Sequence, residues 1–332
     1  AYDKLIDDLY CFDGRLGSCI DYIFNHNYAY DCAFHVNNYG RTWRTYQMYK
    51  DICEKLGIEH FVYDFTGDFD EKVIKKFINA YEIGATPNPC IDCNRHLKFE
   101  KLIQRMYELD YDYVVTGHYA RIEKEGNRYL LKKAVDASKD QSYVLYSMTQ
   151  DQLAHTLFPL GSFTKNEARE IAEENGFVNA KKHDSQDICF VPDGDYAGFI
   201  ERYSGKSYPE GEFVDKDGTV LGVHKGIIRY TIGQRKGLGL SLPAPMYVCQ
   251  KDIENNRVVL CSNDELFEKE LDGDNFNWIA FENPPEKIKC KAKIRYNQRV
   301  RSRPLGSQCK HRGGVLPPDR GRTAHLRHAV YR

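Results

Sequence analysis

The sequence lacks several features that would assign it to a class of protein at once. It has no apolar run of about 18 residues, the length that crosses a bilayer, and no signal-peptide pattern. The formal net charge of its 332 residues is −1, so no overall positive field indicates nucleic acid, and any RNA contact must come from local basic patches. We therefore expect a cytoplasmic protein with no membrane attachment.

Motifs for structural zinc and for disulfide scaffolds are missing too. Cys90 and Cys93 form one C-x₂-C pair, but no second C-x₂-C and no H-x₃-H exists to complete a zinc site. The 11 cysteines are spread over a long chain without a signal, which predicts reduced thiols for most of them. The question is which of these thiols lie in reactive settings.

Helix-like and strand-like segments alternate in the first part of the chain. Residues 46–57 have helical spacing and precede an apolar strand at 60–65, and the same order recurs at 97–110 and 111–117. This alternation predicts a parallel α/β sheet. Ligands of such sheets bind beyond the carboxyl ends of the strands, where TGHYAR (116–121) falls.

The predicted secondary structure changes further along the chain. Residues 140–192 are predicted to be mostly helical, and Thr164 and Glu167 have the spacing of a capping box. Beyond about residue 195 short strands dominate, with a hairpin turn at Asn255–Asn256 and a half-buried strand at FNWIAF (276–281). We expect an α/β catalytic domain at 1–193, a small central domain at 194–262, and a β-rich domain at 263–332 that is degenerate after about residue 303.

Cys93 lies in a setting that favours the thiolate. Pro87 and Pro89 predict a rigid extended loop, and a helix starting near Asn94 would leave Cys93 just ahead of its N-terminus. The helix dipole and the cations within 95–98 would both stabilise a thiolate, which is the nucleophilic form. The alternative is a pair of ordinary buried thiols.

Other polar segments each have two interpretations. Cys189, in the predicted strand ICFV (188–191), is either a core cysteine or part of a loop over a site. Gly117 would allow a ligand to approach the backbone, or it simply ends a strand. The basic segments RYTIGQRKGLGLS (229–241) and KAKIRYNQRVRSR (291–303) suit a phosphate-bearing partner, or are a basic turn and a charged edge strand.

Seven segments together resemble the bacterial tRNA-specific 2-thiouridylases, in which the same motifs occur in the same order. They are TPNPCIDCN, VVTGHYAR, KDQSYVLY, FPLGSFTKNEAREIAEENGF, KHDSQDICFV, YTIGQRKGLGL and KAKIRYNQ, and they span about residues 46–303. The resemblance implies a HUP-like ATP-pyrophosphatase α/β domain with a parallel sheet. A small central domain and an incomplete β-barrel-like C-terminal domain would follow.

The resemblance also implies a reaction: ATP, with Mg²⁺, adenylates O2 of the wobble uridine of tRNA, and a cysteine persulfide then delivers sulfur to C2. A second cysteine releases the product by forming a disulfide. By position Cys93 matches the nucleophile, Cys189 the persulfide-bearing cysteine and Gly117 a nucleotide contact. The positions that match tRNA contacts are Asn88, Pro89, Cys90, His118, Lys139, Asp140, Gln141, Arg295 and Tyr296. A sulfur-donor protein is the implied partner of a monomeric enzyme, and no metal site in the protein is implied.

Two departures from the family keep alternatives open. Cys90 stands where many members carry an aspartate, and the family's pyrophosphate loop S-G-G-V-D-S has only an approximate counterpart in residues 9–22. Candidates for phosphate contact there are Gly14, Gly17 and Ser18. One alternative is a tRNA-binding remnant without catalysis. Another, which we do not favour, assigns Cys90, Cys93 and Cys189 to an iron–sulfur cluster.

Overall fold

A computed structural model describes residues 53–54, 57, 63, 65–177, 188–191, 193–266, 275–286 and 288. The chain divides into two compact units that interleave along the sequence. The first comprises Ala1–Thr66, Cys93–Asp184 and Asp272–Arg332, and the second comprises Gly67–Asp92 and Ser185–Leu271. No helix in the described part is long and apolar enough to cross a membrane.

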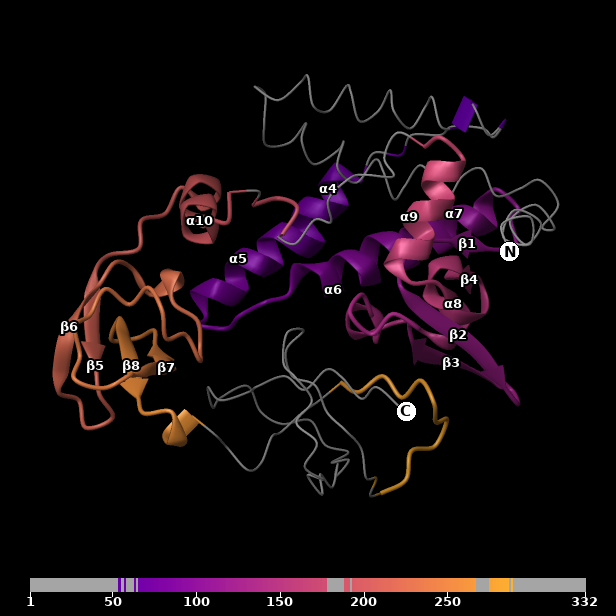
Figure 1. The fold of residues 1–332 in the computed structure, drawn as a ribbon. Coiled ribbons are helices and arrows are strands. Elements are labelled where there is room, and N and C mark those ends of the chain that lie inside the picture. The colour runs from indigo at the N-terminus through magenta and orange to yellow at the C-terminus, as the bar shows by residue number, and fades with distance from the viewer. Residues whose placement is uncertain are drawn as a thin grey trace. The chain divides into compact units, whose positions relative to one another are not determined.

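The first unit contains a helical run, a parallel strand pair and a β-hairpin (Figure 1). Its elements are η3 (Asn94–Lys101, a π-helix), α7 (Leu102–Glu108), β1 (Val114–Val115), β2 (Ala120–Glu125), β3 (Arg128–Lys133), η4 (Ser142–Val144, 3₁₀), α8 (Gln150–Ala154), β4 (Thr156–Leu157), η5 (Pro159–Ser162, 3₁₀) and α9 (Lys165–Glu174).

The parallel arrangement predicted for the first part of the chain is confirmed by β1 and β4. Val114 pairs with Thr156 and Val115 with Leu157. Strand β1 is therefore shorter than the strand predicted at 111–117. The run η3–α7 precedes β1 and buries Leu97 and other apolar side chains. The helix predicted at 46–57 and the strand predicted at 60–65 lie almost wholly outside the described residues.

The mostly helical structure predicted for 140–192 is wrong in its first part. Residues 142–148 contain only the short turn η4, and Tyr143, Val144, Leu145 and Tyr146 are buried one after another. Four consecutive buried side chains do not fit the one-sided apolar stripe of an amphipathic helix, so the chain instead turns through the core. Among the described residues of 140–192, only α8 and α9 are α-helices.

The predicted capping box of α9 is confirmed. The Thr164 side chain accepts a hydrogen bond from the backbone N–H of Glu167, and the Glu167 side chain accepts one from the backbone N–H of Thr164. The helix ends before Gly176, whose φ of 64° lies in the left-handed region that glycine adopts without strain. Local sequence signals therefore set both ends of this helix.

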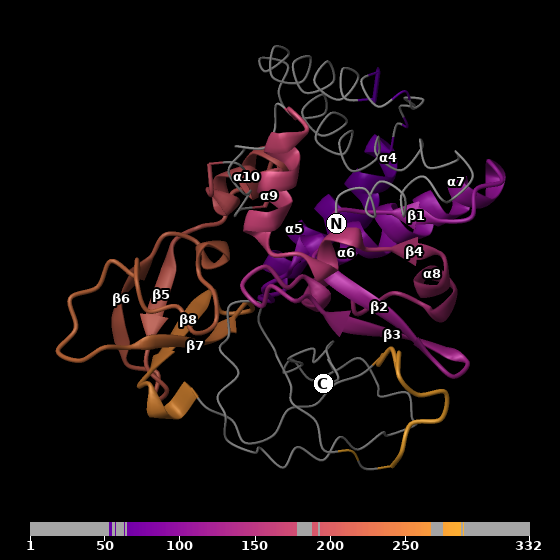
Figure 2. The same cartoon turned by 45° about the vertical axis from the view of Figure 1, so that its right-hand side comes forward.

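The second unit joins a helical run to an open four-stranded sheet (Figure 2). Its elements are α4 (Thr66–Phe69), η2 (Asp70–Ile74, a π-helix), α5 (Lys75–Glu82), α6 (Pro89–Cys93), α10 (Tyr196–Ser204), β5 (Gly211–Val214), β6 (Val220–His224), η6 (Ile227–Arg229, 3₁₀), β7 (Tyr247–Asp252), β8 (Arg257–Cys261) and η7 (Asp264–Leu266, 3₁₀); the first residue of α4 and the last of α6 belong to the first unit.

The sheet of the second unit has the strand order β6-β5-β8-β7. Strands β5 and β8 are parallel, and the other neighbours are antiparallel. The predicted hairpin is confirmed by β7 and β8, whose turn contains Asn256 at a φ of 50°. The end of α5 is attached to the segment before β5, because Glu82 accepts hydrogen bonds from Lys206 Nζ (2.7 Å) and from the Tyr208 hydroxyl (2.5 Å).

Two further predicted strands are wrong. FNWIAF (276–281) is irregular, because its backbone pairs with side chains: Arg128 donates to the carbonyls of Trp278 and Ile279. ICFV (188–191) is a turn in which the Val191 N–H donates to the Ile188 carbonyl. Runs of apolar residues do not distinguish strands from buried irregular segments.

Candidate functional site

The helix that carries Cys93 begins earlier than predicted. Pro89 occupies the first position of α6, which suits its fixed φ, and the Asn88 side chain accepts a hydrogen bond from the Cys90 N–H (3.2 Å). The predicted extended loop up to Asn94 is therefore wrong from Pro89 onward. Because the helix dipole acts mainly within the first turn, it acts on exposed Cys90 more than on Cys93, which is 8% exposed.

A buried polar network lies next to Cys93 in the sequence and involves Asn94. The hydroxyl of Thr116 lies 2.7 Å from Nδ1 of His118, and Nε2 of His118 lies 3.1 Å from Oδ1 of Asn94. The Asn94 amide nitrogen donates to the Val144 carbonyl at 3.4 Å. These contacts join the start of η3, the end of β1 and the turn η4.

Two neighbours make opposite demands on the tautomer of His118, because both face Nε2. Since the amide nitrogen of Asn94 donates to the Val144 carbonyl, its Oδ1 must be the atom that faces His118. Oδ1 can only accept, so this shorter contact favours hydrogen on Nε2, with Nδ1 accepting from the Thr116 hydroxyl; the Lys98 ammonium, 3.5 Å away, would instead need Nε2 as an acceptor. Each polar atom of the imidazole is thereby satisfied inside the protein.

Burial keeps His118 neutral. The side chain is 6% exposed, and its ring centroid lies 5.7 Å from those of Phe99 and Phe158. Burial, and secondarily the charge of Lys98, lowers the pKa of His118 well below its ordinary value. Lys98 Nζ lies 3.5 Å from Nε2. A proton on the imidazole would therefore create two adjacent cations.

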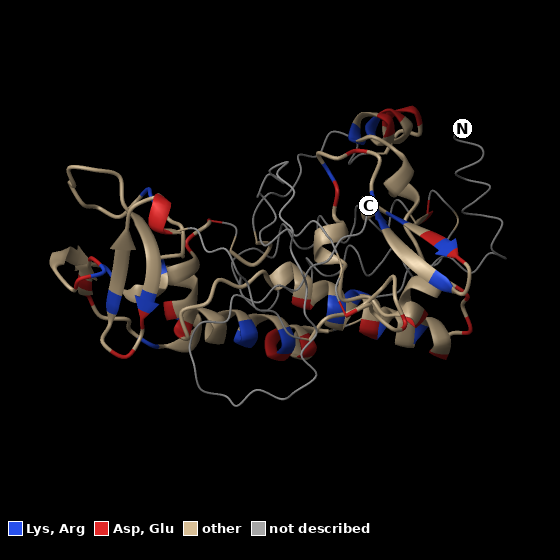
Figure 3. Ribbon diagram, turned by 90° about the horizontal axis from the view of Figure 1, so that it is seen from below, with Lys and Arg blue, Asp and Glu red and all other residues tan. Residues whose placement is uncertain are grey.

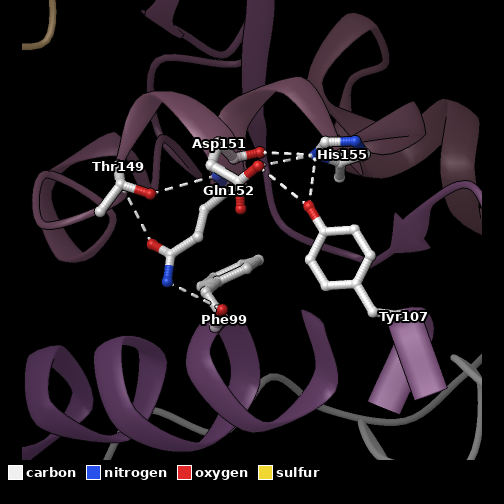
Figure 4. Close-up of polar contacts among 6 residues, drawn as sticks. All are labelled: Phe99, Tyr107, Thr149, Asp151, Gln152 and His155. Carbon is white, nitrogen blue, oxygen red and sulfur yellow. Dashed lines mark hydrogen bonds and ion pairs between the residues drawn. The ribbon is translucent and has the colours of Figure 1, made fainter. Parts of the chain in front are cut away.

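The far end of the same helical run is attached to α8 (Figure 4). Gln152, which also completes the capping box of α8 with Thr149, donates from its side chain to the Phe99 carbonyl at 2.8 Å. The Tyr107 hydroxyl donates to Asp151 at 2.9 Å. Two separated sets of hydrogen bonds thus fix the orientation of η3–α7.

Three neighbouring residues that were predicted to contact tRNA belong to one loop of the first unit. Gln141 exchanges hydrogen bonds with the backbone of Tyr119, accepting its N–H at 2.9 Å through Oε1. Asp140 accepts hydrogen bonds from the Ala134 N–H (3.1 Å) and from both the backbone N–H and the hydroxyl of Ser142. Lys139 is half-buried. Asp140 and Gln141 therefore shape this loop whatever it binds.

Gly117 lies just beyond the carboxyl end of β1 and is exposed. A Cβ built there would meet only a methyl carbon of Leu160, at 3.7 Å, which is ordinary contact. Packing inside the protein therefore does not require glycine at this position, and the space next to the backbone is open. This fits the predicted approach of a nucleotide.

The second unit contains Asn88, Pro89, Cys90 and exposed Cys189. The turn that carries Cys189 is fixed by its neighbour Phe190, whose ring packs edge-on against Phe69 (5.9 Å) and Phe77 (5.1 Å). The thiol itself is accessible while its neighbour is buried. Cys189 is thus not a core cysteine.

The remaining predicted site residues lie outside the described residues: Gly14, Gly17, Ser18, Arg295 and Tyr296. None of the described cysteines forms a disulfide; they are Cys53, Cys90, Cys93, Cys189, Cys249 and Cys261. Within the described ranges, no group of three or more His, Cys, Asp or Glu residues could hold a metal ion.

Sequence reasoning missed Asn94 and Thr116 as site residues. Asn94 was interpreted only as a helix start, although it is 3% exposed, and Thr116 only as part of the segment TGHYAR at a strand end, with no role of its own. The signal available was the placement of two polar residues beside apolar runs in NRHLKF and VVTGH. Only the fold reveals that they meet at one histidine.

Basic and acidic residues are interspersed along the described ribbon (Figure 3). On the β2–β3 hairpin, Arg121 and Lys132 both form ion pairs with Glu123, at 3.2 and 3.0 Å. Exposed pairs of this kind contribute little to stability. They do show that this hairpin is not a purely basic surface.

Two family models match the chain. One, described as the tRNA methyl transferase HUP domain, matches residues 18–193, and the other, described as the tRNA methyl transferase PRC-barrel domain, matches residues 197–262. Together with the parallel pair β1–β4, they confirm the predicted HUP-like fold followed by a separate β domain. Among the described strands the sheet is open rather than closed into a barrel.

Curated relatives are similar over most of the chain. The tRNA-specific 2-thiouridylase MnmA 1 of Thermoanaerobacter sp. (strain X514) is 52% identical over 248 residues, covering 74% of this chain and 68% of the relative. MnmA of Clostridioides difficile (strain 630) is 49% identical over 248 residues, covering 74% and 69%. MnmA of Clostridium kluyveri is 46% identical over 273 residues, covering 82% and 77%.

Proposed function

The chain belongs to the family of tRNA-specific 2-thiouridylases, and we propose that it transfers sulfur to C2 of the wobble uridine of tRNA. The observation that carries this proposal is about 50% identity to named 2-thiouridylases over three quarters of the chain. The span matched to the HUP family model also includes both Cys93 and Cys189. The substrate tRNA and the class of reaction follow from the family; the roles of individual residues are our proposal.

Activation of the uridine is the first step that we propose. A carbonyl oxygen is a poor leaving group, so O2 attacks the α-phosphorus of ATP and pyrophosphate leaves, with Mg²⁺ accompanying the nucleotide. Gly117, exposed beyond the carboxyl end of β1, would lie against the nucleotide. Gly14, Gly17 and Ser18, outside the described residues, would contact its phosphates.

Sulfur transfer follows between the two cysteines. The terminal sulfur of a persulfide on Cys189 attacks C2, and AMP leaves with the electrons of the C2–O bond. The Cys93 thiolate then attacks the inner sulfur, so that a Cys93–Cys189 disulfide forms and C2 keeps the transferred sulfur. External thiols must reduce this disulfide before the next cycle, and a sulfur-donor protein must renew the persulfide.

Substrate binding is assigned to three segments of the chain. Asn88, Pro89 and Cys90 would surround the target base, while Lys139, Asp140 and Gln141 would shape a loop that contacts tRNA. Arg295 and Tyr296, outside the described residues, would add a cation and a ring for stacking. The domain limits near residues 193 and 262 remain a proposal, which the ends of the two family models support.

The test is a reconstituted reaction. The purified chain, ATP with Mg²⁺, unmodified tRNA, cysteine and a cysteine desulfurase should yield 2-thiouridine, read by mass spectrometry of digested tRNA. Cys93→Ser and Cys189→Ser should each abolish product, whereas the matched control Cys249→Ser, another thiol of the second unit, should not. Unmodified uridine in the wild-type reaction, with the donor shown to be active, would contradict the proposal.

A non-catalytic tRNA-binding protein is the second candidate. The observation that favours it is the poor match of residues 9–22 to the family's pyrophosphate loop. This candidate predicts salt-dependent tRNA binding without any tRNA-dependent release of AMP. Measuring AMP therefore separates the two candidates even where no sulfur donor is supplied.

A further inference from the structure

A glycine-rich loop of the second unit, residues 231–240, carries two neighbouring cations that no described residue neutralises. Arg235 and Lys236 are both exposed, and within the described ranges neither side chain forms an ion pair or a hydrogen bond. By contrast, Arg229, two residues before this loop, is bound to the Glu201 carboxylate at 3.0 Å. Neighbouring charges without counter-charges leave a local positive potential on the surface.

The side chain of Gln234 holds the loop in shape from within. Its Oε1 accepts a hydrogen bond from the Thr231 N–H at 3.0 Å, and its Nε2 donates to the Lys236 carbonyl at 3.0 Å. The backbone N–H of Gln234 also donates to the Thr231 carbonyl at 2.9 Å. One amide side chain thus connects the residues on the two sides of Arg235.

The loop is also attached to two strands of the sheet. The Gly233 N–H donates to the Val248 carbonyl at 2.7 Å, and the Val248 N–H donates to the Gln234 carbonyl at 2.9 Å, which joins the loop to β7. At the other end, the Leu240 side chain fills the space beside Gly222 of β6, where a Cβ would otherwise lie. Because the backbone is already fixed, a ligand would not have to order this loop on binding.

Between these attachments the backbone is open to an anion. Gly237 and Gly239 have φ of 77° and 72°, in the left-handed region that other residues adopt only with strain. Among the described residues, no acceptor binds the backbone N–H groups of 235–240. Free N–H groups on successive residues, together with cations, are features of phosphate-binding loops.

We propose, given the thiolation function above, that this loop binds the phosphate backbone of tRNA, with the cations of Arg235 and Lys236 as the main contacts. An exposed cation holds a single phosphate weakly, because water screens the attraction. RNA presents phosphates in a row, so that several such contacts act together. The loop would hold tRNA on the unit that contains Cys189 without reading the sequence of bases.

The experiment measures the binding of unmodified tRNA by the full chain at several salt concentrations, with no sulfur donor present. The double variant Arg235→Gln, Lys236→Gln should bind tRNA about tenfold more weakly at low salt. The slope of log Kd against log salt should fall by about one for each cation removed. Both side chains are exposed, so circular dichroism should show an unchanged fold.

A matched control removes the same charge from the same unit. In Lys216→Gln, Arg257→Gln, the two cations lost are ones that carboxylates already neutralise: Glu265 lies 3.3 Å from Lys216, and Glu212 lies 3.0 Å from Arg257. Affinity for tRNA and the salt slope should both stay close to those of the wild type. An equal loss in the control and in the loop variant would show a general effect of net charge and would overturn the proposal.

ATP is the other source of phosphate that the loop could bind. Under our proposal, the loop variant should bind ATP with Mg²⁺ as tightly as the wild type does. Weaker ATP binding with unchanged tRNA binding would assign the loop to the nucleotide and overturn the proposal. So would a tRNA affinity and a salt slope equal to those of the wild type. Because the assay needs no turnover, that result would leave the thiolation function standing.

Discussion

His118 Nε2 lies 3.1 Å from the side-chain oxygen of Asn94, the residue immediately after Cys93. This contact brings the end of the first parallel strand to the start of η3, directly after the proposed nucleophile. Four predictions follow from the network and from the surrounding fold, and the thiolation chemistry supplies a last one.

Asn94→Leu should destabilise the first unit. The substitution removes the donor to the Val144 carbonyl and the acceptor for His118, so two buried groups lose their partners, at a cost of about 1–3 kcal/mol. Urea unfolding followed by circular dichroism measures this change. The matched control Gln104→Leu, an exposed residue on the same helical run, should shift the free energy of unfolding by less than about 0.5 kcal/mol.

Stability should depend on pH through His118. Its pKa in the folded state lies well below the ordinary 6.5, chiefly because of burial, so between those two values the unfolded chain binds more protons. The free energy of unfolding should therefore be unaffected above about pH 6.5 and fall below it, by up to about 1.4 kcal/mol per pH unit. Lys98 is the charged group that faces the ring.

The measurement for this pH effect is a difference between two proteins. The free energy of unfolding is measured against pH for the wild type and for His118→Gln, and one profile is subtracted from the other. The subtraction cancels the contributions of the carboxylates and of the other histidines. A difference with no slope between pH 6.5 and pH 5 would contradict a buried neutral imidazole.

Thr164→Ala should loosen α9. The variant loses the side-chain acceptor for the Glu167 N–H, an N-cap contact that contributes about 1 kcal/mol. No described residue of this helix is buried, so packing does not compensate, and hydrogen exchange within 165–174 should quicken. Thr164→Ser keeps the acceptor, and its exchange should match the wild type; equal exchange in all three proteins would refute the capping role.

Lys251 should titrate far below an ordinary lysine. Its ammonium donates to the Tyr230 carbonyl at 3.0 Å and lies 5.7 Å from the centroid of Tyr81, and burial lowers its pKa to about 8. The pH profile of amine acetylation, read by peptide mass, should give a midpoint near 8 for Lys251. Lys75, whose pKa is raised by its hydrogen bonds to Glu71 and then Asp70, should have a midpoint above its ordinary value and provides the internal comparison.

Sequence reasoning succeeded where a structure depends on neighbours along the chain. The capping box of Thr164 and Glu167 and the turn at Asn256 are local, and both were predicted correctly. It failed where burial decides: Pro89 starts a helix rather than a loop, and the buried residues 143–146 cross the core without forming a helix. The His118 network joins residues 94, 116, 118 and 144, and no spacing in the sequence indicates that contact.

The central claim is that sulfur passes from Cys189 to tRNA with Cys93 as the second thiol. A single-turnover reaction with ³⁵S persulfide loaded on the protein, followed after addition of ATP, Mg²⁺ and tRNA, tests it most directly. Label should be released on tRNA in the wild type as a Cys93–Cys189 disulfide replaces the Cys93 thiol and the Cys189 persulfide, and it should never load on Cys189→Ser. In Cys93→Ser it should stay in a covalent adduct that joins Cys189 to tRNA through a disulfide. Label released on free tRNA from Cys93→Ser at the wild-type rate, or label that never leaves the wild-type protein, would contradict the account.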